Sequence, residues 1–441
     1  MMFVKPSNWN KLTPEEKKKL RMDHWEKAEG VQFVSPEAEA KYRERAHRLR
    51  MAYDLAHPDR PIADFAMGSE YPIRRAGLTG YDILYNHEKL VEPIVQFNEE
   101  FQPDTAVIGF PYPGKVFDLL DLKTYDWGGH GLPKTQVIQM IEKEYMTPDE
   151  YPEFTMDPSG FFLKKYLGRF MGELAPLGML ADLPRLTEIV DVMGFVAPFG
   201  LPPVQEMFRK LLQAGDEMTK IFSVIGQMNL AGRGFPTMGA GFAKAPFDFL
   251  GDTLRGTKGI MMDMYRRPKQ LLAACEAYVP ILIKQLTDAC DMTGNPCVMY
   301  PLHKGADGFM SQQQFETFYW PTFKAVLLGL WEEGIMGAMF VEGSYNSRLE
   351  TIADMPKGSC YWLFDQSDMR RVKDCLADHA TIGGNVPASV MQTGSPEKLR
   401  KVCDELVDLF SDAPGYILAL GCGIETTTDE KVRIFLDSVK K

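Results

Sequence analysis

Five side chains that could do chemistry follow five short apolar runs in the second half of this 441-residue chain. They are His303 after CVMYPL, Glu342 after MGAMFV, Asp365 after CYWLF, Asn385 within ATIGGNV and Cys422 after YILAL. Imidazole, carboxylate and thiolate are the usual ligands of zinc, and three protein ligands with one open position describe a catalytic zinc ion. We therefore expect zinc on Glu342, Cys422 and His303. Whether His303 or Asp365 completes that set is left open, and Glu342 and Asp365 are the catalytic candidates.

The apolar runs alternate with amphipathic segments, which predicts strands and helices in turn. The predicted strands are 297–302, 336–341, 360–364, 380–386 and 416–420, and the predicted helices are 267–292, 311–334 with a break at Pro321, 347–355, 367–377, 395–410 and 428–440. This order implies parallel strands with right-handed crossovers, in a doubly wound sheet or a barrel. In both folds ligands meet the carboxyl ends of the strands, so the five side chains should converge on one rim.

The first half is less regular. Residues 1–60 are rich in charge, and Ser35 with Pro36 has the pattern of a helix start, so we expect a helical N-terminal extension. Residues 61–441 are expected to form the body, with early strands at 62–66 and 104–110. Between 135 and 230 the sequence contains helix-like pieces, and no strand is placed there.

Composition excludes several classes of protein. The formal net charge is −11, which disfavours nucleic-acid binding. The seven cysteines include no CxxC pair, which indicates a reducing compartment and hence a cytoplasmic protein. No signal peptide and no apolar run of membrane-spanning length is expected. No strand leads into a G-x-G-x-x-G or Walker A motif, so the phosphate cradle of a nucleotide-binding fold is not predicted.

Three late segments carry a resemblance to a known family. Gly384-Asn385-Val386-Pro387, Gly394-Ser395-Pro396-Glu397 and Gly421-Cys422-Gly423-Ile424 resemble the C-terminal signature of the uroporphyrinogen decarboxylase superfamily. Met310–Phe315 is similar to the "ISPEQF" helix start of that family. The resemblance covers roughly residues 60–440 and implies a single (β/α)₈ TIM barrel, in agreement with the strand and helix pattern.

The resemblance implies two kinds of chemistry. The decarboxylase branch has an arginine motif after its first strand and an Asp after its second. Here the first reads Ile73-Arg74-Arg75-Ala76-Gly77, which keeps the arginines, and the second, Ile108-Gly109-Phe110-Pro111-Tyr112, has no Asp. A metal-free lyase, with Arg74 and Arg75 clamping an acidic substrate, is therefore the alternative function. A non-catalytic barrel that binds a ligand is the third.

The other branch comprises corrinoid-dependent methyltransferases, whose thiol-methylating members bind zinc through an H-x-C-G motif and a late Cys. This chain has Phe340-Val341-Glu342-Gly343 at the first motif and Cys422 at the second. Glu in place of His and Cys gives a harder, more Lewis-acidic site. We therefore predict an enzyme that moves a methyl group from a small methylated substrate to a corrinoid (cobalamin) carried by a partner protein.

The substrate side of that site is also predicted. Asn385, Tyr71, Arg74 and Arg75 are the substrate-binding candidates. Tyr71, Tyr112, Trp362 and Phe364 are aromatic residues that would suit a methoxyaromatic donor. The oligomeric state is left open, with a homo-oligomer allowed.

Overall fold

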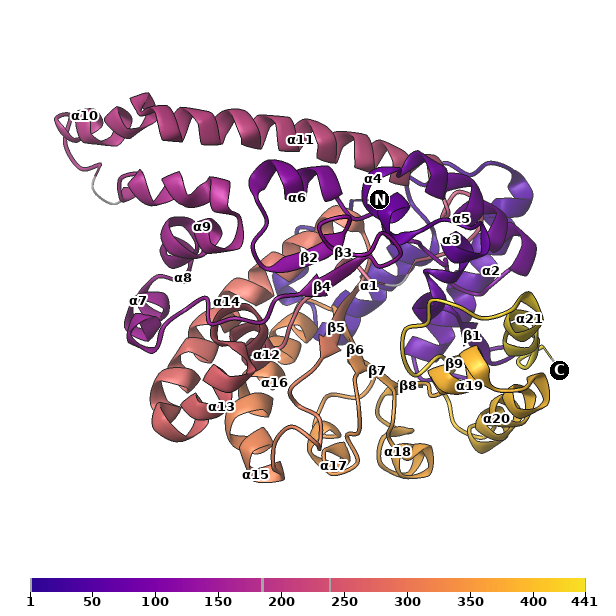
Figure 1. The fold of residues 1–441 in the computed structure, drawn as a ribbon. Helices are drawn as coiled ribbons and strands as arrows, with labels where there is room; N and C mark the ends of the chain where they lie inside the picture. Colours follow the sequence, from indigo (N-terminus) through magenta and orange to yellow (C-terminus); the bar gives the residue numbers. More distant parts are fainter. Residues whose placement is uncertain (1, 184–185, 238, 441) are drawn as a thin grey trace.

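The structure is a computed structural model that describes residues 2–183, 186–237 and 239–440. Its centre is a sheet of six parallel strands in the order β1-β9-β8-β7-β6-β5 (Figure 1). Their bounds are Ile62–Asp64 (β1), Cys297–Leu302 (β5), Met336–Val341 (β6), Cys360–Phe364 (β7), Thr381–Gly383 (β8) and Tyr416–Ala419 (β9). All five late strands are confirmed, with β8 and β9 shorter than predicted.

Two extended segments fill the gap between β1 and β5. Residues 239–243 lie along β5, where Ala240 N donates to Cys297 O at 2.6 Å and Met299 N to Gly241 O at 3.0 Å. Residues 104–110 lie between them and β1, and Ala106 N donates to Pro236 O at 2.9 Å. The predicted strand at 104–110 is thus extended chain without a regular ladder. Together with the six strands these segments complete the eight positions of a (β/α)₈ barrel.

Helices surround the strands (Figure 1). Those of the second half are α14 (Pro268–Thr293), α15 (Gln312–Gln314), α16 (Trp320–Trp331), α17 (Leu349–Ile352), α18 (Met369–Leu376), α19 (Ala388–Thr393), α20 (Pro396–Leu409) and α21 (Asp429–Asp437). Ser311 caps α15 and Ser395 caps α20 through their side chains. The expected interruption near Pro321 takes the form of a π-helical turn, Phe315–Tyr319, between α15 and α16, and Pro321 lies in the first turn of α16.

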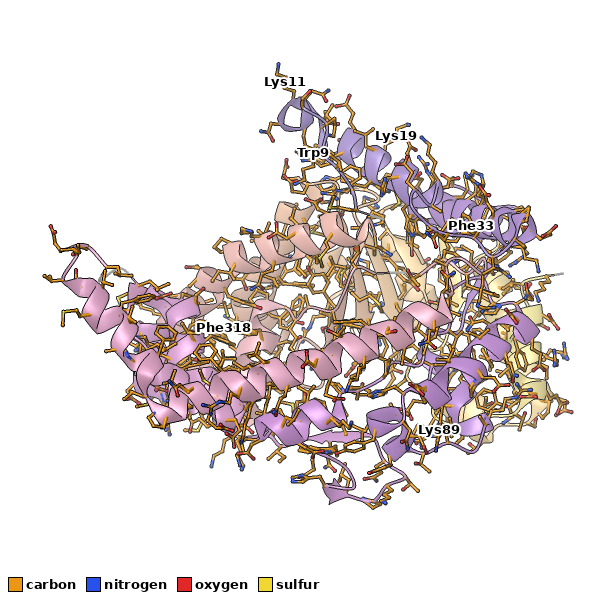
Figure 2. The ribbon with its side chains drawn as sticks, turned by 90° about the horizontal axis from the view of Figure 1, so that it is seen from above. Trp9, Lys11, Lys19, Phe33, Lys89 and Phe318 are labelled. Carbon is orange, nitrogen blue, oxygen red and sulfur yellow. The ribbon has the colours of Figure 1, made fainter. Side chains whose placement is uncertain are left out.

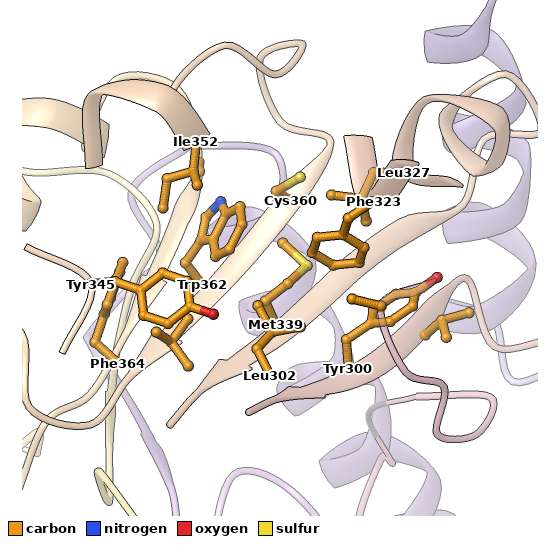
Figure 3. Close-up of a cluster of buried hydrophobic side chains, with 14 of the residues drawn as sticks. Tyr300, Leu302, Phe323, Leu327, Met339, Tyr345, Ile352, Cys360, Trp362 and Phe364 are labelled. Atoms are coloured by element: carbon orange, nitrogen blue, oxygen red, sulfur yellow. The ribbon is translucent and has the colours of Figure 1, made fainter. Parts of the chain in front are cut away.

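Alternate residues of the strands face opposite layers of the core. Tyr300, Met339 and Trp362 pack outward against helix residues such as Phe323 and Ile352 (Figure 3). The residues between them face the barrel interior; these are Cys297, Met299, Met336, Ala338, Phe340, Tyr361, Leu363, Ile417 and Ala419. This alternation fixes which side chain at each strand end can point into the barrel.

The N-terminal extension covers one end of the barrel. It contains α1 (Pro14–Glu26), capped by Thr13, and α2 (Pro36–Tyr53), capped by Ser35. Trp25 and Leu49 pack against the first residues of the strands, including Ile62, Cys297 and Met336. Figure 2 shows these helices, with Trp9, Lys19 and Phe33 labelled, along one side of the molecule. The extension therefore closes the amino end of the barrel and leaves the carboxyl end for ligands.

Residues 65–101 follow β1 and hold α3 (Tyr71–Arg75), α4 (Gly80–Tyr85) and α5 (Glu88–Phe101). A long insertion then separates the two extended segments. It contains α6 (Gly114–Leu120), a small sheet of β2 (Tyr125–Gly128), β3 (Gly131–Leu132) and β4 (Ile138–Met140), then α7 (Tyr151–Met156), α8 (Pro158–Phe161), α9 (Leu167–Phe170), α10 (Asp191–Val196) and α11 (Pro202–Met228). The strand β4 lies within residues 135–230, where the sequence pattern does not locate a strand. The short α12 (Pro246–Asp248) and α13 (Gly256–Arg266) lead into α14.

α10 and α11 reach outward beyond the barrel (Figure 1). Among the helices that the structure describes, none is long and apolar enough to cross a membrane.

Candidate functional site

Three of the predicted chemical residues meet at the carboxyl end of the strands. His303, Glu342 and Asp365 directly follow β5, β6 and β7, and each continues the inward-facing series of its strand. His303 Nε2 lies 3.6 Å from Glu342 Oε1. Asp365 is close enough to Glu342 to raise its pKa. Strand alternation thus brings these three side chains to one rim, as the sequence predicts.

The imidazole of His303 is held in one orientation. Its Nδ1 lies 2.6 Å from Asp252 Oδ2, and a carboxylate can only accept, so Nδ1 carries the hydrogen. This leaves Nε2 facing Glu342. Burial opposes the charged form, but the hydrogen bond and the charge of Asp252 raise the pKa of His303. The arrangement favours an imidazole that carries and exchanges protons on its Nε2 side.

Asp248 fixes the backbone that carries His303. Its Oδ2 accepts from His303 N at 3.1 Å, and its Oδ1 accepts from Lys304 N at 2.8 Å. The hydroxyl of Tyr319 donates to Oδ2 at 2.6 Å. Because Asp248 is fully buried, these bonds anchor the end of β5 to α12.

Two lysines surround Asp252. Lys304 Nζ lies 2.6 Å from Oδ1 and Lys244 Nζ lies 2.7 Å from Oδ2. Although burial opposes ionisation, the bonds from His303 and the two lysines hold the pKa of Asp252 well below its usual range. Asp252 is therefore an ionised anchor for His303.

Sequence reasoning missed Asp248, Asp252 and Lys244. Asp248 ends α12, and Asp252 lies in the π-helical turn Phe249–Arg255 that follows it. Such turns are frequent at functional sites. Two carboxylates four residues apart in the otherwise apolar stretch PFDFLGD were the signal that could have found them, because an apolar helix buries its acidic residues only when they have partners.

The surroundings of Glu342 favour the protonated form of its carboxyl group. Burial raises its pKa, as do the neighbouring carboxylates Asp248, Asp252 and Asp365, while His303 lowers it. The net direction is upward. A carboxyl group with a raised pKa next to an imidazole is a typical acid–base pair of an active site.

Asp365 and Cys422 complete the rim. Asp365 Oδ2 accepts from Gly343 N at 3.1 Å and thereby ties the loop after Glu342 to the end of β7. Cys422 follows β9 and is exposed. Partial burial and then the charges of Asp365 and Glu342 raise the pKa of its thiol. The rim is thus rich in negative charge, which suits a cation or a proton donor.

The expected zinc ligands do not form a complete set in this structure. His303 and Glu342 face each other, but among the described residues no group of three or more His, Cys, Asp and Glu side chains is arranged to hold a metal ion. In this arrangement the rim supplies acid–base chemistry from its own residues.

The predicted substrate-binding residues are mostly engaged elsewhere. Asn385 donates both amide hydrogens to backbone oxygens, those of Asp365 and Ser367, at 3.0 Å each. Tyr71 and Arg75 both bind Asp429 at the start of α21, at 2.7 Å.

Arg74 is paired with acidic side chains, those of Glu70 at 3.0 Å and Glu425 at 3.7 Å. Trp362 and Phe364 lie in the layer between strands and helices, not on the rim (Figure 3). Of this predicted set, Asn385 contacts a rim residue directly, through its bond to the backbone of Asp365.

Comparison with known proteins agrees with this architecture. The model of the family "Uroporphyrinogen decarboxylase (URO-D)" matches residues 207–441, more than half of the chain. No curated protein sequence matches the chain. Among solved structures, a methyltransferase from Methanosarcina mazei is similar, with a TM-score of 0.56 and 14% sequence identity over 89% of this chain and 96% of that one. At this identity the likeness is one of fold.

Proposed function

The chain belongs to the uroporphyrinogen decarboxylase family, and we propose that it is a methyltransferase of that family. The observation that carries the proposal is the His303–Glu342 pair at the barrel rim, held by Asp252. The similar methyltransferase from Methanosarcina mazei supports the same reading. The expected reaction moves a methyl group from a heteroatom of a small substrate to a corrinoid on a partner protein.

The rim residues account for the proton that such a reaction needs. When the bond between the methyl carbon and the heteroatom breaks, the heteroatom keeps the bonding electrons and must gain a proton. Glu342, with its raised pKa, is placed to donate that proton. His303 Nε2, 3.6 Å away, can then restore it. A reduced corrinoid supplies the cobalt nucleophile that accepts the methyl group.

We also propose that the protein binds zinc. The residues that would hold it are His303, Glu342 and Cys422, and they are not arranged as a three-ligand set here. Metal analysis of the purified protein, with Cys422→Ser as the comparison, tests whether zinc is bound.

The decarboxylase-like alternative is disfavoured by the arginines. A carboxylate clamp needs arginines free to form bidentate pairs with the substrate. Arg75 is paired with Glu100 at 2.8 Å and Asp429 at 2.7 Å, and Arg74 with Glu70 at 3.0 Å. Release of carbon dioxide from a porphyrinogen by the wild-type chain would overturn this part of the argument.

The deciding experiment incubates the chain with cob(I)alamin and a panel of methyl ethers, methylamines and methyl thioethers. Demethylated product is measured by chromatography. We expect turnover of at least one donor class, and a loss of about 100-fold or more with Glu342→Gln, which keeps the shape but cannot donate the proton. Glu350→Gln, an exposed residue on α17, is the matched control and should keep full activity. Equal activity of the two variants would contradict the role of Glu342.

A further inference from the structure

The outer face of α11 carries a line of exposed residues that do not belong to any of the hydrophobic core clusters. The stripe consists of Phe208, Leu212, Gly215, Thr219, Phe222 and Gly226, spaced alternately by four and three residues, and all six are exposed. Leu212 is 72% exposed and Phe222 is 63% exposed. This spacing is that of the contact line between two packed helices. We call this set the outer stripe.

The other face of α11 already packs against the body. Val204, Met207 and Ala214 join the cluster of α6 and its neighbours, and Val224 and Met228 join that of α5. Helix α11 is about 40 Å long, from its 27 residues, and lies along the top edge of the molecule in Figure 1. The outer stripe is therefore a second contact line that points away from the barrel. Its first residue, Phe208, stacks on Phe199 with ring centroids 5.9 Å apart.

The glycines of the outer stripe have no function within this chain. A Cβ added at Gly215 or Gly226 would meet no described atom within 4 Å. Glycine in a helix interior is unfavourable, so two unconstrained glycines on one line indicate that something outside the chain approaches there closely. The hydroxyl of Thr219 donates to Gly215 O at 3.1 Å, so this polar group is satisfied within α11 and needs no partner outside the helix.

Large and small residues of the outer stripe are self-complementary. In an antiparallel pair of α11 helices centred on residue 217, positions equally far before and after it meet. Phe208 then lies opposite Gly226, Leu212 opposite Phe222, and Gly215 opposite Thr219. Every residue of the outer stripe then faces another residue of the outer stripe, with Phe208 opposite Gly226, and this reciprocity is what an isologous two-fold interface requires.

The charges beside the outer stripe fit the same pairing. Asp216 and Lys220 are both exposed on one flank, where Lys220 Nζ also lies 2.7 Å from Glu217 Oε1 of its own chain. In the antiparallel pair, Asp216 of one copy and Lys220 of the second copy lie two residues apart, or about 3 Å, along the common axis. The stripe itself contains no charged residue. The apolar tip from Leu186 to Phe208 has acidic residues but no Lys or Arg, and the two cations that follow it are paired, Arg209 with Glu206 and Lys210 with Glu173. Helices α10 and α11 are therefore poorly suited to a phospholipid surface.

From these features we infer that the outer stripe of α11 binds the α11 of a second copy of this chain, antiparallel and centred on residue 217. The inference is independent of the proposed function. It predicts a dimer in which the two α11 helices form the interface and the two barrels lie on either side of it.

Sedimentation of the full chain over a wide concentration range tests the inference, with Gly226→Leu as the main variant. The added side chain has room within the monomer and favours the helix, but it occupies the space that Phe208 of the second copy needs. We expect a wild-type dimer and at least a tenfold rise in its dissociation constant. Gln213→Leu adds the same side chain to an exposed position outside the outer stripe and should leave the dimer intact.

Cross-linking tests the direction of the pair independently. Leu212→Cys and Phe222→Cys chains, both carrying Cys422→Ser to remove the exposed thiol, are mixed and oxidised. Antiparallel pairing predicts a mixed disulfide between positions 212 and 222. A wild-type chain that stays monomeric at all concentrations, including one that binds phosphatidylcholine vesicles instead, would overturn the inference. So would an unchanged dimer in Gly226→Leu, or disulfides only between like positions.

Discussion

The two sides of the barrel are held together in different ways. From residue 297 onward, neighbouring strands pair along regular ladders, as in the six-residue register of β5 with β6. Between residues 61 and 296, side chains form many of the hydrogen bonds to the backbone that neighbouring strands form elsewhere. Asn98 accepts from Val107 N and donates to Val107 O, both at 2.9 Å, and Asp104 Oδ2 accepts from Ala63 N at 3.1 Å.

Buried charge follows the same division. Among the described residues, the buried charged side chains after residue 297 are Lys304, Arg348 and Lys431. The earlier part buries many more, among them the pair Arg255 and Asp263 with Nε and Oδ2 2.7 Å apart. The difference teaches that a barrel needs eight positions, but not eight equivalent strands. Where the ladder is incomplete, polar side chains fix the chain in its place.

The largest effect should come from breaking a buried ion pair of the irregular side. Asp263→Ala leaves Arg255 buried without its main partner and removes the acceptor of the Tyr151 hydroxyl, 2.9 Å away. We expect a loss of about 3–5 kcal/mol in the free energy of unfolding, measured by urea denaturation. Asp354→Ala, which removes an exposed partner of Lys324, should cost less than about 1 kcal/mol. Similar losses in both variants would remove the distinction between the two sides.

The second effect concerns a side chain that binds backbone groups which a neighbouring strand would otherwise bind. Asn98→Leu fills similar space but leaves the N–H and C=O of Val107 buried without their partners. We expect a loss of about 2–4 kcal/mol, from two unsatisfied backbone groups. Hydrogen exchange at Val107 should accelerate at the same time. A change in stability without faster exchange there would place the effect of Asn98 elsewhere.

The third effect is a dependence on pH. The bond from Arg169 holds the pKa of Glu150 at about 2, below its unfolded value of 4.5. The lowered pKa means that the ionised form is stabilised by folding, so its contribution is present above about pH 4.5 and is lost as the pH falls toward 2. We expect this contribution to be about 1–2 kcal/mol, since Arg169 is partly exposed. Glu150→Gln should therefore differ from wild type in unfolding free energy at pH 6 but not at pH 2.

The smallest effect belongs to the regular side. Ser395 caps α20 by accepting from Lys398 N at 3.2 Å. Ser395→Ala should cost about 1 kcal/mol, because one amide at the helix start loses its partner. Thermal unfolding measures the change. A larger loss than that of Asn98→Leu would reverse the comparison between the two sides.

The same division explains what could be predicted from the sequence. The strands from 297 onward were predictable because apolar runs of the right length alternate with amphipathic helices. Their period of two also places His303, Glu342 and Asp365 on the inward face. Asp252 was not predictable in this way, because its contact with His303 joins distant segments, and the role of Lys244 follows from its pairing with Asp252. Tyr71 and Arg75 turn instead toward Asp429, a partner that no local spacing reveals.

The pairing of β1 with β9 has a consequence for biosynthesis. Ile62 lies in register with Ile417, so the ring of strands closes between the beginning and the end of the chain. At a ribosomal rate of about 5–20 residues per second, roughly 20–70 s separate the emergence of these two residues. During that interval the apolar residues of α1 and α2 lack the strands against which they pack in the folded chain. Because β1 gains its β9 partner last, we expect a chain truncated before residue 416 to expose an unpaired strand edge and to aggregate.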